Sequence, residues 1–317
     1  MNSKGEQLCF PLSDETRQDK TTPITIHSML NPVEPLKLEG ASYILCGDAL
    51  QVLKLLPANS IRCCITSPPY WGLRDYGTTG QIGVENNLND YIDALVVIFR
   101  EVKRVLTDDG TLWLNLGDAY TSGGRAYRAP DKKTDNGHVV RGLPFRPPTP
   151  EGLKPKDLIG IPWRVAFRLQ EDGWYLRSDI IWYKPNAIPE SVKDRPTLAH
   201  EYLFLLSKSE RYYYDYNAIR EATENGRGYR NKRTVWAVNT QAFPEAHFAT
   251  FPEKLIEPCV KAGSAPGDYI LDPFFGSGTS GLVAAKLQRN FVGIDINPRY
   301  VAMAQNRILS EVKAGLS

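Results

Sequence analysis

The chain has 317 residues, enough for one large domain or two modest ones, and its 42% hydrophobic and 23% charged residues are typical of globular proteins. This composition excludes a wholly disordered, collagen-like or coiled-coil protein. No apolar run approaches the roughly 18 residues of a membrane span, and residues 1–40 lack the apolar core of a signal peptide, so we expect a soluble, cytoplasmic protein. The 38 basic and 36 acidic residues leave a net charge of +2, which by itself indicates no polyanionic partner.

The cysteine and histidine counts favour neither a disulfide framework nor a metal site. The five cysteines are odd in number and include no Cys-x-x-Cys pair, and there are only four histidines. Disulfide frameworks and four-ligand zinc sites are built from paired cysteines at defined spacing. We therefore expect a chain that holds no metal.

Residues 1–41 differ in pattern from the rest of the chain. They mix polar, proline and charged residues without periodicity, which predicts an N-terminal arm, and we expect regular structure to begin near Ser42. Further along, short apolar runs alternate with segments of helical spacing. We expect strands at 43–46, 62–66, 111–116, 175–183, 201–207, 269–271 and 291–294, and helices at 49–56, 88–106, 157–170, 253–262, 280–287 and 298–309. The alternation predicts one α/β domain over 42–317, with a mostly parallel seven-stranded sheet covered on both faces.

Two segments, 117–156 and 208–250, do not fit this alternation. The first is rich in proline and glycine and the second in tyrosine and arginine. Residues 122–156 hold eight basic and three acidic residues, a local +5, and residues 208–233 hold seven and four, a local +3. Both segments are solvated loops or contacts for a polyanion, and their charge favours phosphate contacts. The run Tyr212-Tyr213-Tyr214 fits either such a surface or a strand with one buried face.

A glycine-rich loop lies between a predicted strand and a predicted helix near the C-terminus. Its residues Gly276, Gly278 and Gly281 fit the pattern GxGxxG, which indicates either a tight turn or a loop that approaches a nucleotide. Asp295 ends the next predicted strand, 23 positions after Asp272 (295 minus 272). A carboxylate at that place can accept hydrogen bonds from both hydroxyls of a ribose. Together these features favour an adenosine-containing cofactor.

The order of the elements indicates a circular permutation. After Asp295 only one helix fits before the chain stops, whereas a βαβαβ half-sheet needs a third strand. The unassigned candidate is the strand that ends before Asp48, at the other end of the sequence. We therefore expect the N-terminal strand to complete the cofactor half-site that the C-terminal segment begins, an arrangement that neighbouring chain termini permit.

The sequence Ser67-Pro68-Pro69-Tyr70 follows the predicted strand 62–66, at the sheet edge where ligands of α/β proteins bind. Because two prolines remove two backbone donors, the turn offers carbonyl acceptors, and Ser67 adds a hydroxyl. Tyr70 and Trp71 add flat apolar faces. Such a turn suits a planar ring that bears an exocyclic amino group.

With these motifs the chain resembles the amino-group DNA methyltransferases that use S-adenosyl-L-methionine. The resemblance covers about residues 42–309 and rests on Ser67-Pro68-Pro69-Tyr70, Asp272-Pro273-Phe274 with Gly276-Ser277-Gly278-Thr279, and Phe251-Pro252-Glu253-Lys254-Leu255. It implies the Rossmann-like methyltransferase fold in the permuted order called β, so 42–317 would be a catalytic domain. In this family Ser-Pro-Pro-Tyr is usual for cytosine N4 and Asp-Pro-Pro-Tyr for adenine N6, which favours cytosine and leaves adenine as the alternative.

The resemblance also implies roles for individual residues. The catalytic residues would be Ser67, Pro68, Pro69 and Tyr70, acting on a base flipped out of double-stranded DNA. The cofactor-binding residues would be Asp48, Phe251, Asp272, Phe274, Gly276, Gly278, Thr279 and Asp295. The DNA-binding residues would be Trp71, Arg125, Lys132, Lys133, Arg141, Arg227, Arg230 and Arg233, with 208–250 the usual place for target recognition. Trp71 fits base stacking or packing beneath the segment 72–83. A cognate restriction endonuclease is a possible functional partner, and the protein would be a monomer or a homodimer.

Other readings explain fewer of these features. A nicotinamide oxidoreductase would use GxGxxG but leaves Ser-Pro-Pro-Tyr without a role, and a non-enzymatic DNA-binding module explains only the basic segments. Cys259 follows a proline, as does the nucleophile of carbon-5 cytosine methyltransferases, but it lies within a predicted helix and is interpreted as core packing. Protein-glutamine and RNA methyltransferases commonly place a related Asn-Pro-Pro-Tyr turn after the cofactor loop, the reverse of the order here.

Overall fold

The computed structural model describes residues 25–75, 78–122, 141–142, 147–241 and 251–314. In these residues nine strands form one large sheet in the order β1-β2-β13-β12-β3-β5-β8-β7-β11. The strands are β1 Ile26–Leu30, β2 Ser42–Cys46, β3 Ile61–Thr66, β5 Leu106–Leu116, β7 Tyr175–Tyr183, β8 His200–Ser207, β11 Val235–Ala237, β12 Tyr269–Asp272 and β13 Asn290–Asp295. Strand β8 runs antiparallel to β5 and β7, and all other neighbours are parallel.

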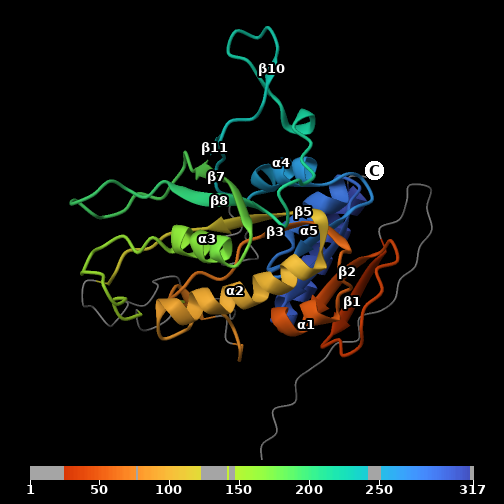
Figure 1. Ribbon diagram of the computed structural model, residues 1–317, viewed down its shortest axis with the longest axis horizontal. Coiled ribbons are helices and arrows are strands. Elements are labelled where there is room, and N and C mark those ends of the chain that lie inside the picture. The colour runs from red at the N-terminus through yellow and green to blue at the C-terminus, as the bar shows by residue number, and fades with distance from the viewer. Residues whose placement is uncertain (1–24, 76–77, 123–140, 143–146, 242–250, 315–317) are drawn as a thin grey trace, which may run out of the picture.

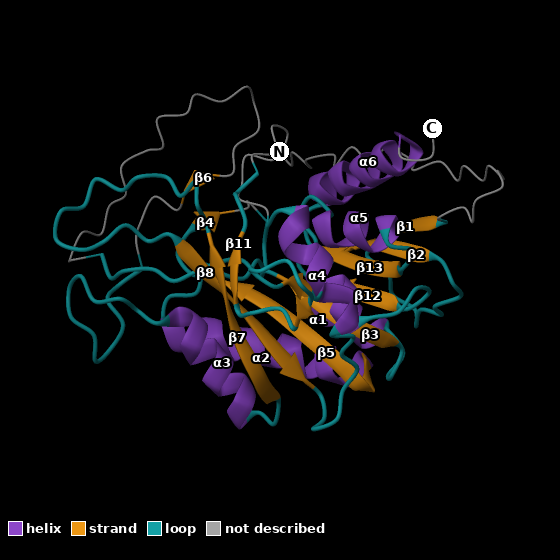
Figure 2. Cartoon of the chain, turned by 90° about the horizontal axis from the view of Figure 1, so that it is seen from above, coloured by secondary structure: helices purple, strands orange, loops and turns teal. Residues whose placement is uncertain are grey.

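Helices cover both faces of this sheet, as Figures 1 and 2 show. The first face carries α1 Ala49–Leu55, α2 Leu88–Val105 and α3 Ile161–Glu171, and the second carries α4 Glu253–Gly263, α5 Thr279–Lys286 and α6 Pro298–Ala314. The central strands are almost entirely buried because they are covered twice; all five residues of β2 are buried, for example. This confirms the predicted α/β fold.

The sheet order confirms the circular permutation. Strand β13, near the C-terminus, pairs with β2, near the N-terminus, along a parallel register that joins Asp295 to Cys46 and Val292 to Tyr43. On its other side β13 pairs with β12, and β12 pairs with the strand that precedes Ser67, β3. The two predicted motifs therefore follow the ends of adjacent strands, although about 200 residues separate them in the sequence.

Within the described residues the large sheet has nine strands, two more than the seven that the sequence predicts. The seven expected strands form its continuous middle, from β2 to β7, and one further strand lies at each edge. Strand β1 lies within the expected N-terminal arm and pairs in parallel with β2, so the expectation that structure begins near Ser42 was wrong. Strand β11 lies within the segment 208–250 and pairs with β7. Both edge strands are short and partly exposed, so neither carries the continuous apolar run that marks a buried strand.

The strand after α2 also begins earlier than expected. The sequence predicts a helix at 88–106 and a strand only from 111, whereas β5 runs continuously from Leu106 through Asp108, Asp109 and Gly110. Its pairing with β3 is interrupted between Ile61 and Cys63, where the register shifts. An irregularity of this kind accommodates extra residues within a strand, which is why turn-forming residues stand inside β5.

Parts of the segment 208–250 belong to the body of the protein. Tyr214 is half-buried and stacks on Trp113 of β5 at 6.3 Å between ring centroids, and Ile219, in the short 3-10 helix η1 (Asn217–Ile219), is buried. Between η1 and β11, the two short strands β9 (Glu221–Ala222) and β10 (Tyr229–Arg230) pair into a hairpin. Figure 1 shows this hairpin projecting from the body at the top of the view. The tyrosine run is thus partly core, and the hairpin is the exposed part of the segment.

Candidate active site

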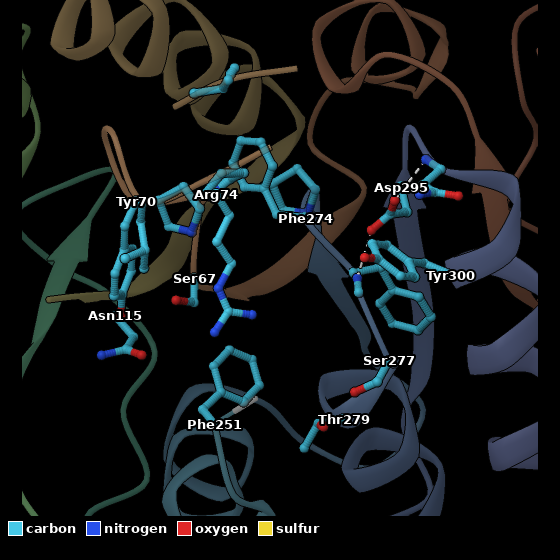
Figure 3. A pocket seen from close by; sticks show the side chains of 18 of the residues that line it. Ser67, Tyr70, Arg74, Asn115, Phe251, Phe274, Ser277, Thr279, Asp295 and Tyr300 are labelled. Atoms are coloured by element: carbon cyan, nitrogen blue, oxygen red, sulfur yellow. Dashed lines mark hydrogen bonds between the residues drawn. The ribbon is translucent and has the colours of Figure 1, made fainter. Parts of the chain in front are cut away.

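A pocket at the carboxyl-terminal edge of the sheet joins the two predicted motifs. Figure 3 shows Ser67 and Tyr70 on one side of it and Asp295, Tyr300, Ser277 and Thr279 on the other. The predicted residues that line it are Asp48, Ser67, Pro68, Pro69, Tyr70, Phe251, Phe274, Gly276, Thr279 and Asp295. Ligands of open α/β sheets bind at this edge, so the pocket lies where the sequence placed it.

Asp272 does not line the pocket; its carboxylate is buried beneath it and joins the two motifs. Oδ1 accepts hydrogen bonds from Thr66 Oγ1 at 2.6 Å and from the Phe274 amide at 3.1 Å, and Oδ2 accepts one from Ser280 Oγ at 2.6 Å. Burial raises the pKa of this carboxyl to about 6, against the opposing effect of these donors. Its predicted direct contact with the cofactor is therefore replaced by a positioning role between β3, the glycine loop and α5.

The glycines of the loop act in different ways. Gly276 and Gly278 have positive φ angles of 51° and 78°, a conformation that side chains other than glycine rarely adopt. Gly278 does not line the pocket, since it packs against α6, and a Cβ there would lie 2.8 Å from that of Ala304. Gly281 makes room for Phe275, because a Cβ there would lie 2.5 Å from the aromatic ring. Of the three glycines in the GxGxxG pattern, only Gly276 faces the ligand space.

Asp295 stands at the end of β13 with its carboxylate held by backbone donors. Oδ2 accepts a hydrogen bond from the Gly276 amide and Oδ1 accepts one from the Asn297 amide, each at 2.8 Å. Burial raises the pKa of Asp295 to about 6, and these two donors oppose the rise. Each oxygen keeps a further lone pair, so the carboxylate can still accept the two hydroxyls of a ribose.

The remaining walls of this half of the pocket suit an adenosine-containing ligand. Phe274 and Tyr300 lie beside Asp295 and offer aromatic faces, and Phe251 lies across from them (Figure 3). The hydroxyls of Ser277 and Thr279 are held by Arg307 at 3.3 and 2.9 Å. Aromatic faces that can stack on a base, and a carboxylate at a strand end that accepts ribose hydroxyls, are features that a nucleoside site requires.

The Ser-Pro-Pro-Tyr turn is fixed by contacts on both of its sides. Tyr91 of α2 donates its hydroxyl to the Pro69 carbonyl at 2.9 Å. The Tyr70 hydroxyl donates to Glu201 Oε2 at 2.6 Å. Burial, and next the charge of Glu201, raise the pKa of Tyr70 well above its ordinary value, which keeps this phenol protonated and donating. The Tyr70 ring packs closely on the backbone of Gly117, at the end of β5.

Three residues that the sequence analysis did not single out complete this half of the pocket. They are Asn115, Lys184 and Glu201, which all line it. Glu201 Oε2 also accepts a hydrogen bond from Asn115 Nδ2 at 3.1 Å, and Oε1 pairs with Lys184 Nζ. Lys184 directly follows the strand β7, and this position could have identified it from the sequence as a candidate site residue. Glu201 lies near the beginning of β8, and only the antiparallel direction of β8 brings that end to the ligand edge.

Trp71 occupies a different environment from the one predicted. Its side chain is 6% exposed and belongs to the hydrophobic core cluster on the first face of the sheet. Its indole N–H donates to the Glu85 carbonyl at 3.0 Å. The residue thus packs beneath the segment that follows it, and its predicted contact with DNA is contradicted by this burial.

The predicted DNA-binding arginines and lysines fall into two groups. Arg125, Lys132 and Lys133 lie outside the described residues, and of Arg141 only the backbone is described, in the strand β6 (Arg141–Gly142), which pairs with β4 (Arg74–Asp75). The other group lies on the hairpin and its C-terminal side. Arg227 is exposed there, and Arg230 and Arg233 both pair with Glu221 and Glu224.

The described part of the chain contains neither a candidate metal cluster nor a candidate membrane span. No cluster of three or more histidine, cysteine, aspartate or glutamate side chains among the described residues could hold a metal ion. No helix in the described part of the chain has the length and apolar character needed to cross a membrane. Cys259 is buried, and burial raises the pKa of its thiol well above the ordinary value, as expected for core packing.

Comparisons with known proteins show the family to which the chain belongs. The DNA methylase family model matches residues 61–306, so the chain belongs to that family, whose cofactor is S-adenosyl-L-methionine. The chain is 62% identical to the type II methyltransferase M.Cfr9I of Citrobacter freundii over 92% of its own length and 95% of the relative's. It is 58% identical to the type II methyltransferase M.SmaI of Serratia marcescens, over 84% of its own length and 90% of the relative's.

Solved structures share the fold. The PvuII DNA methyltransferase, described as cytosine-N4-specific, aligns with a TM-score of 0.62 at 21% identity, over 85% of this chain and 90% of that one. The complex of M1.HpyAVI with its cofactor SAM aligns with a TM-score of 0.54 at 19% identity, over 84% and 98%. The permuted methyltransferase fold is thereby confirmed, and the chain is a DNA methyltransferase.

Proposed function

We propose that this enzyme transfers a methyl group from S-adenosyl-L-methionine to the exocyclic N4 amine of a cytosine flipped out of duplex DNA. The observation that carries the proposal is the position of Ser67. It directly follows the strand β3, whose neighbour β12 leads into the glycine loop, and it lines the same pocket as Asp295. A serine at this position of the turn is the family's usual residue for cytosine N4.

The cofactor would occupy the half of the pocket formed by Asp295, Phe274 and Gly276. When bound, S-adenosyl-L-methionine supplies a methyl group made electrophilic by its sulfonium. Asp295 would accept the ribose hydroxyls through the lone pairs that its two backbone donors leave free. Gly276 would let the backbone approach closely, because it carries no side chain on that side.

The turn would hold the amine and expose its lone pair. The amine of cytosine is conjugated to its ring and is a poor nucleophile. Acceptors at the Ser67 hydroxyl and the Pro68 carbonyl would hold its two hydrogens and direct the lone pair toward the methyl group. The lone pair would form the new N–C bond as the S–C bond breaks with its electrons left on sulfur, and the methylated amine would then give one proton to solvent. Alignment of this kind contributes several kcal/mol, roughly, to lowering the barrier.

Tyr70 would form a wall of the base site. Its ring lies beside Ser67 in Figure 3, and its hydroxyl is fixed by Glu201. A ring held at one end loses little freedom when a base stacks on it, which offsets part of the few kcal/mol needed to flip the base. Adenine N6 remains the alternative target, because the same acceptors suit any exocyclic amine.

The exposed hairpin of β9 and β10 is proposed as part of the DNA contact. It projects from the body, and Arg227 is exposed on it. Arg230 and Arg233 are held by carboxylates, which orders the base of the hairpin and reduces the charge they can offer to phosphate. The segment 117–156 remains a second proposed contact on its charge alone.

The names of the relatives also support a proposed role in restriction and modification. Both curated relatives described above are named type II methyltransferases. We propose that this enzyme likewise protects one DNA site from a cognate endonuclease. Plasmid DNA from a host that expresses the enzyme would then resist an endonuclease that cuts the unmodified site.

The test of the target atom is the identity of the modified nucleoside. The enzyme is expressed in a bacterial host without its own DNA methylation, and the genomic DNA is digested to nucleosides and analysed by mass spectrometry. N4-methylcytosine is expected, and N6-methyladenine would overturn the cytosine assignment. The Ser67→Ala variant serves as the control for the motif, since it should lower the modification strongly while the protein remains folded. Sequencing that reads modified bases gives the recognition site from the same DNA.

A further inference from the structure

The pocket contains a buried ion pair that neither motif predicts. Lys184 and Glu201 pair directly, and their side chains are only 18% and 13% exposed. Removing two charges from water costs free energy that their attraction often fails to recover, so a buried pair is weak evidence of a stabilising role. Both residues line the pocket that contains Ser67. A ligand-binding role explains the pair better than a contribution to stability.

Glu201 uses its oxygens to hold the walls of the base site. Oε2 accepts from Tyr70 at 2.6 Å and from Asn115 at 3.1 Å, while Oε1 accepts from Lys184. These contacts connect the turn after β3 with the ends of β5 and β7. Since Tyr70 belongs to the same turn as Ser67, Glu201 links the catalytic turn to the ammonium group of Lys184.

Lys184 keeps donors available to a ligand. An ammonium group has three N–H donors, and within the described residues only Glu201 accepts a hydrogen bond from it. The nitrogen lies 4.3 Å from the centroid of the Trp182 ring, a cation–π contact that holds it in place against the pocket wall. Two donors therefore remain for a group that enters the pocket.

We propose that Lys184 binds the N3 and O2 atoms of the flipped cytosine and thereby selects cytosine over adenine. This inference rests on the proposed function. With the amine of cytosine held at Ser67, the same edge of the base presents two adjacent acceptors, N3 and O2. The two remaining donors of Lys184 match them in number and in kind.

Adenine fits this arrangement less well. When its amine is held at the turn, the same edge presents one acceptor, N1, followed by a C–H group. One of the two lysine donors would then be left without a partner in a pocket shielded from water, which is costly. Discrimination of this kind between bases typically amounts to roughly 10- to 100-fold for each well-formed pair of contacts.

The test combines a lysine variant with altered bases in duplexes that carry the mapped site. The target is cytosine, 3-deazacytosine, which lacks the N3 acceptor, or 2-thiocytosine, whose sulfur accepts poorly in place of O2. Single-turnover rates are measured with saturating cofactor for the wild type and for Lys184→Met. Because an altered base also changes the reactivity of the amine, the coupling between variant and analogue is the readout.

If Lys184 binds this edge, the single-turnover rate of the wild type should be roughly 10- to 100-fold lower on an analogue than on cytosine. On cytosine, the rate of Lys184→Met should be lower than that of the wild type by about the same factor. For at least one analogue, the rate of Lys184→Met should then be little lower than its rate on cytosine. If, for both analogues, the rate loss caused by the analogue and the rate loss caused by Lys184→Met simply multiply, the proposal is overturned. A wild type that methylates adenine at its mapped site would instead overturn the proposed function, so the two failures are distinguishable.

Two further variants control for misfolding and for nonspecific effects of removing a lysine. Lys184→Met leaves a buried carboxylate without its cation, so Lys184→Met/Glu201→Gln is tested in parallel if the single variant does not fold. Calorimetric binding of S-adenosyl-L-methionine reports folding independently of the base site. Lys193→Met, which removes an exposed lysine of the loop between β7 and β8, should leave the rates and the response to both analogues unchanged.

Discussion

The two halves of the active site are built in different ways. The cofactor half rests mainly on the glycine loop after β12 and on Asp295 at the end of β13, which are held by backbone hydrogen bonds and by close packing at glycines. The base half draws single side chains from β5, β7, β8 and the turn after β3, and Glu201 holds them together. A backbone-built site tolerates side-chain changes around it, whereas a site built from distant side chains depends on its central residue.

The largest expected effect is that of Glu201→Ala on the base half alone. Tyr70, Asn115 and Lys184 would lose their common acceptor, and misplacement of catalytic groups by about 1 Å costs on the order of 100-fold in rate. The turnover rate should fall by about this factor while the dissociation constant of S-adenosyl-L-methionine changes little. Single-turnover kinetics and calorimetry measure the two quantities. Glu171→Ala, at an exposed glutamate, is the matched control. Equal losses in both quantities would contradict the separation of the halves.

Asp272→Ala should affect both halves, because this carboxylate joins them. It would leave the buried hydroxyls of Thr66 and Ser280 without their acceptor, at a cost of about 2–3 kcal/mol in the free energy of unfolding. Denaturant unfolding measures this loss, and both cofactor affinity and turnover should decline. Asp272→Asn retains an acceptor oxygen and should cost less. A variant that lost turnover alone would argue against the linking role.

The cofactor half should respond to pH through Asp295. Its pKa is raised to about 6, so its carboxylate is ionised above this pH and protonated below it. If the ionised form accepts the ribose hydroxyls, cofactor affinity should be nearly constant above pH 7 and should fall about tenfold between pH 7 and pH 5. Calorimetric titrations across this range test the prediction. Asp295→Asn should bind weakly at every pH, and a wild type without pH dependence would exclude the role.

The smallest effect is expected outside both halves, at the hairpin. Arg227 is exposed, and Arg227→Gln should weaken DNA binding a few-fold and reduce the slope of log affinity against log salt by about 1. Arg230→Gln should change the slope less, because that guanidinium is already paired with Glu221. Fluorescence anisotropy at several salt concentrations distinguishes the two. An unchanged slope in both variants would remove the hairpin from the interface.

Much of the fold was predictable because its signals are local. Each of the seven central strands contains a short apolar run, and the permutation followed from counting elements after Asp295. The edge strands β1 and β11 were missed because strands exposed on one side need no such run. Trp71 was placed wrongly for a related reason: an aromatic residue beside a catalytic turn fits stacking and core packing equally well until its surroundings are known.

What the sequence determined by itself is the chemistry of the two motifs. Ser67-Pro68-Pro69-Tyr70 and the glycine loop are contiguous, so their acceptors and their backbone freedom can be read from neighbouring residues. Only the tertiary structure decided which side chains surround the base. Glu201 meets Tyr70 across 131 positions because β8 runs antiparallel, and the direction of a strand in a sheet is set by its neighbours.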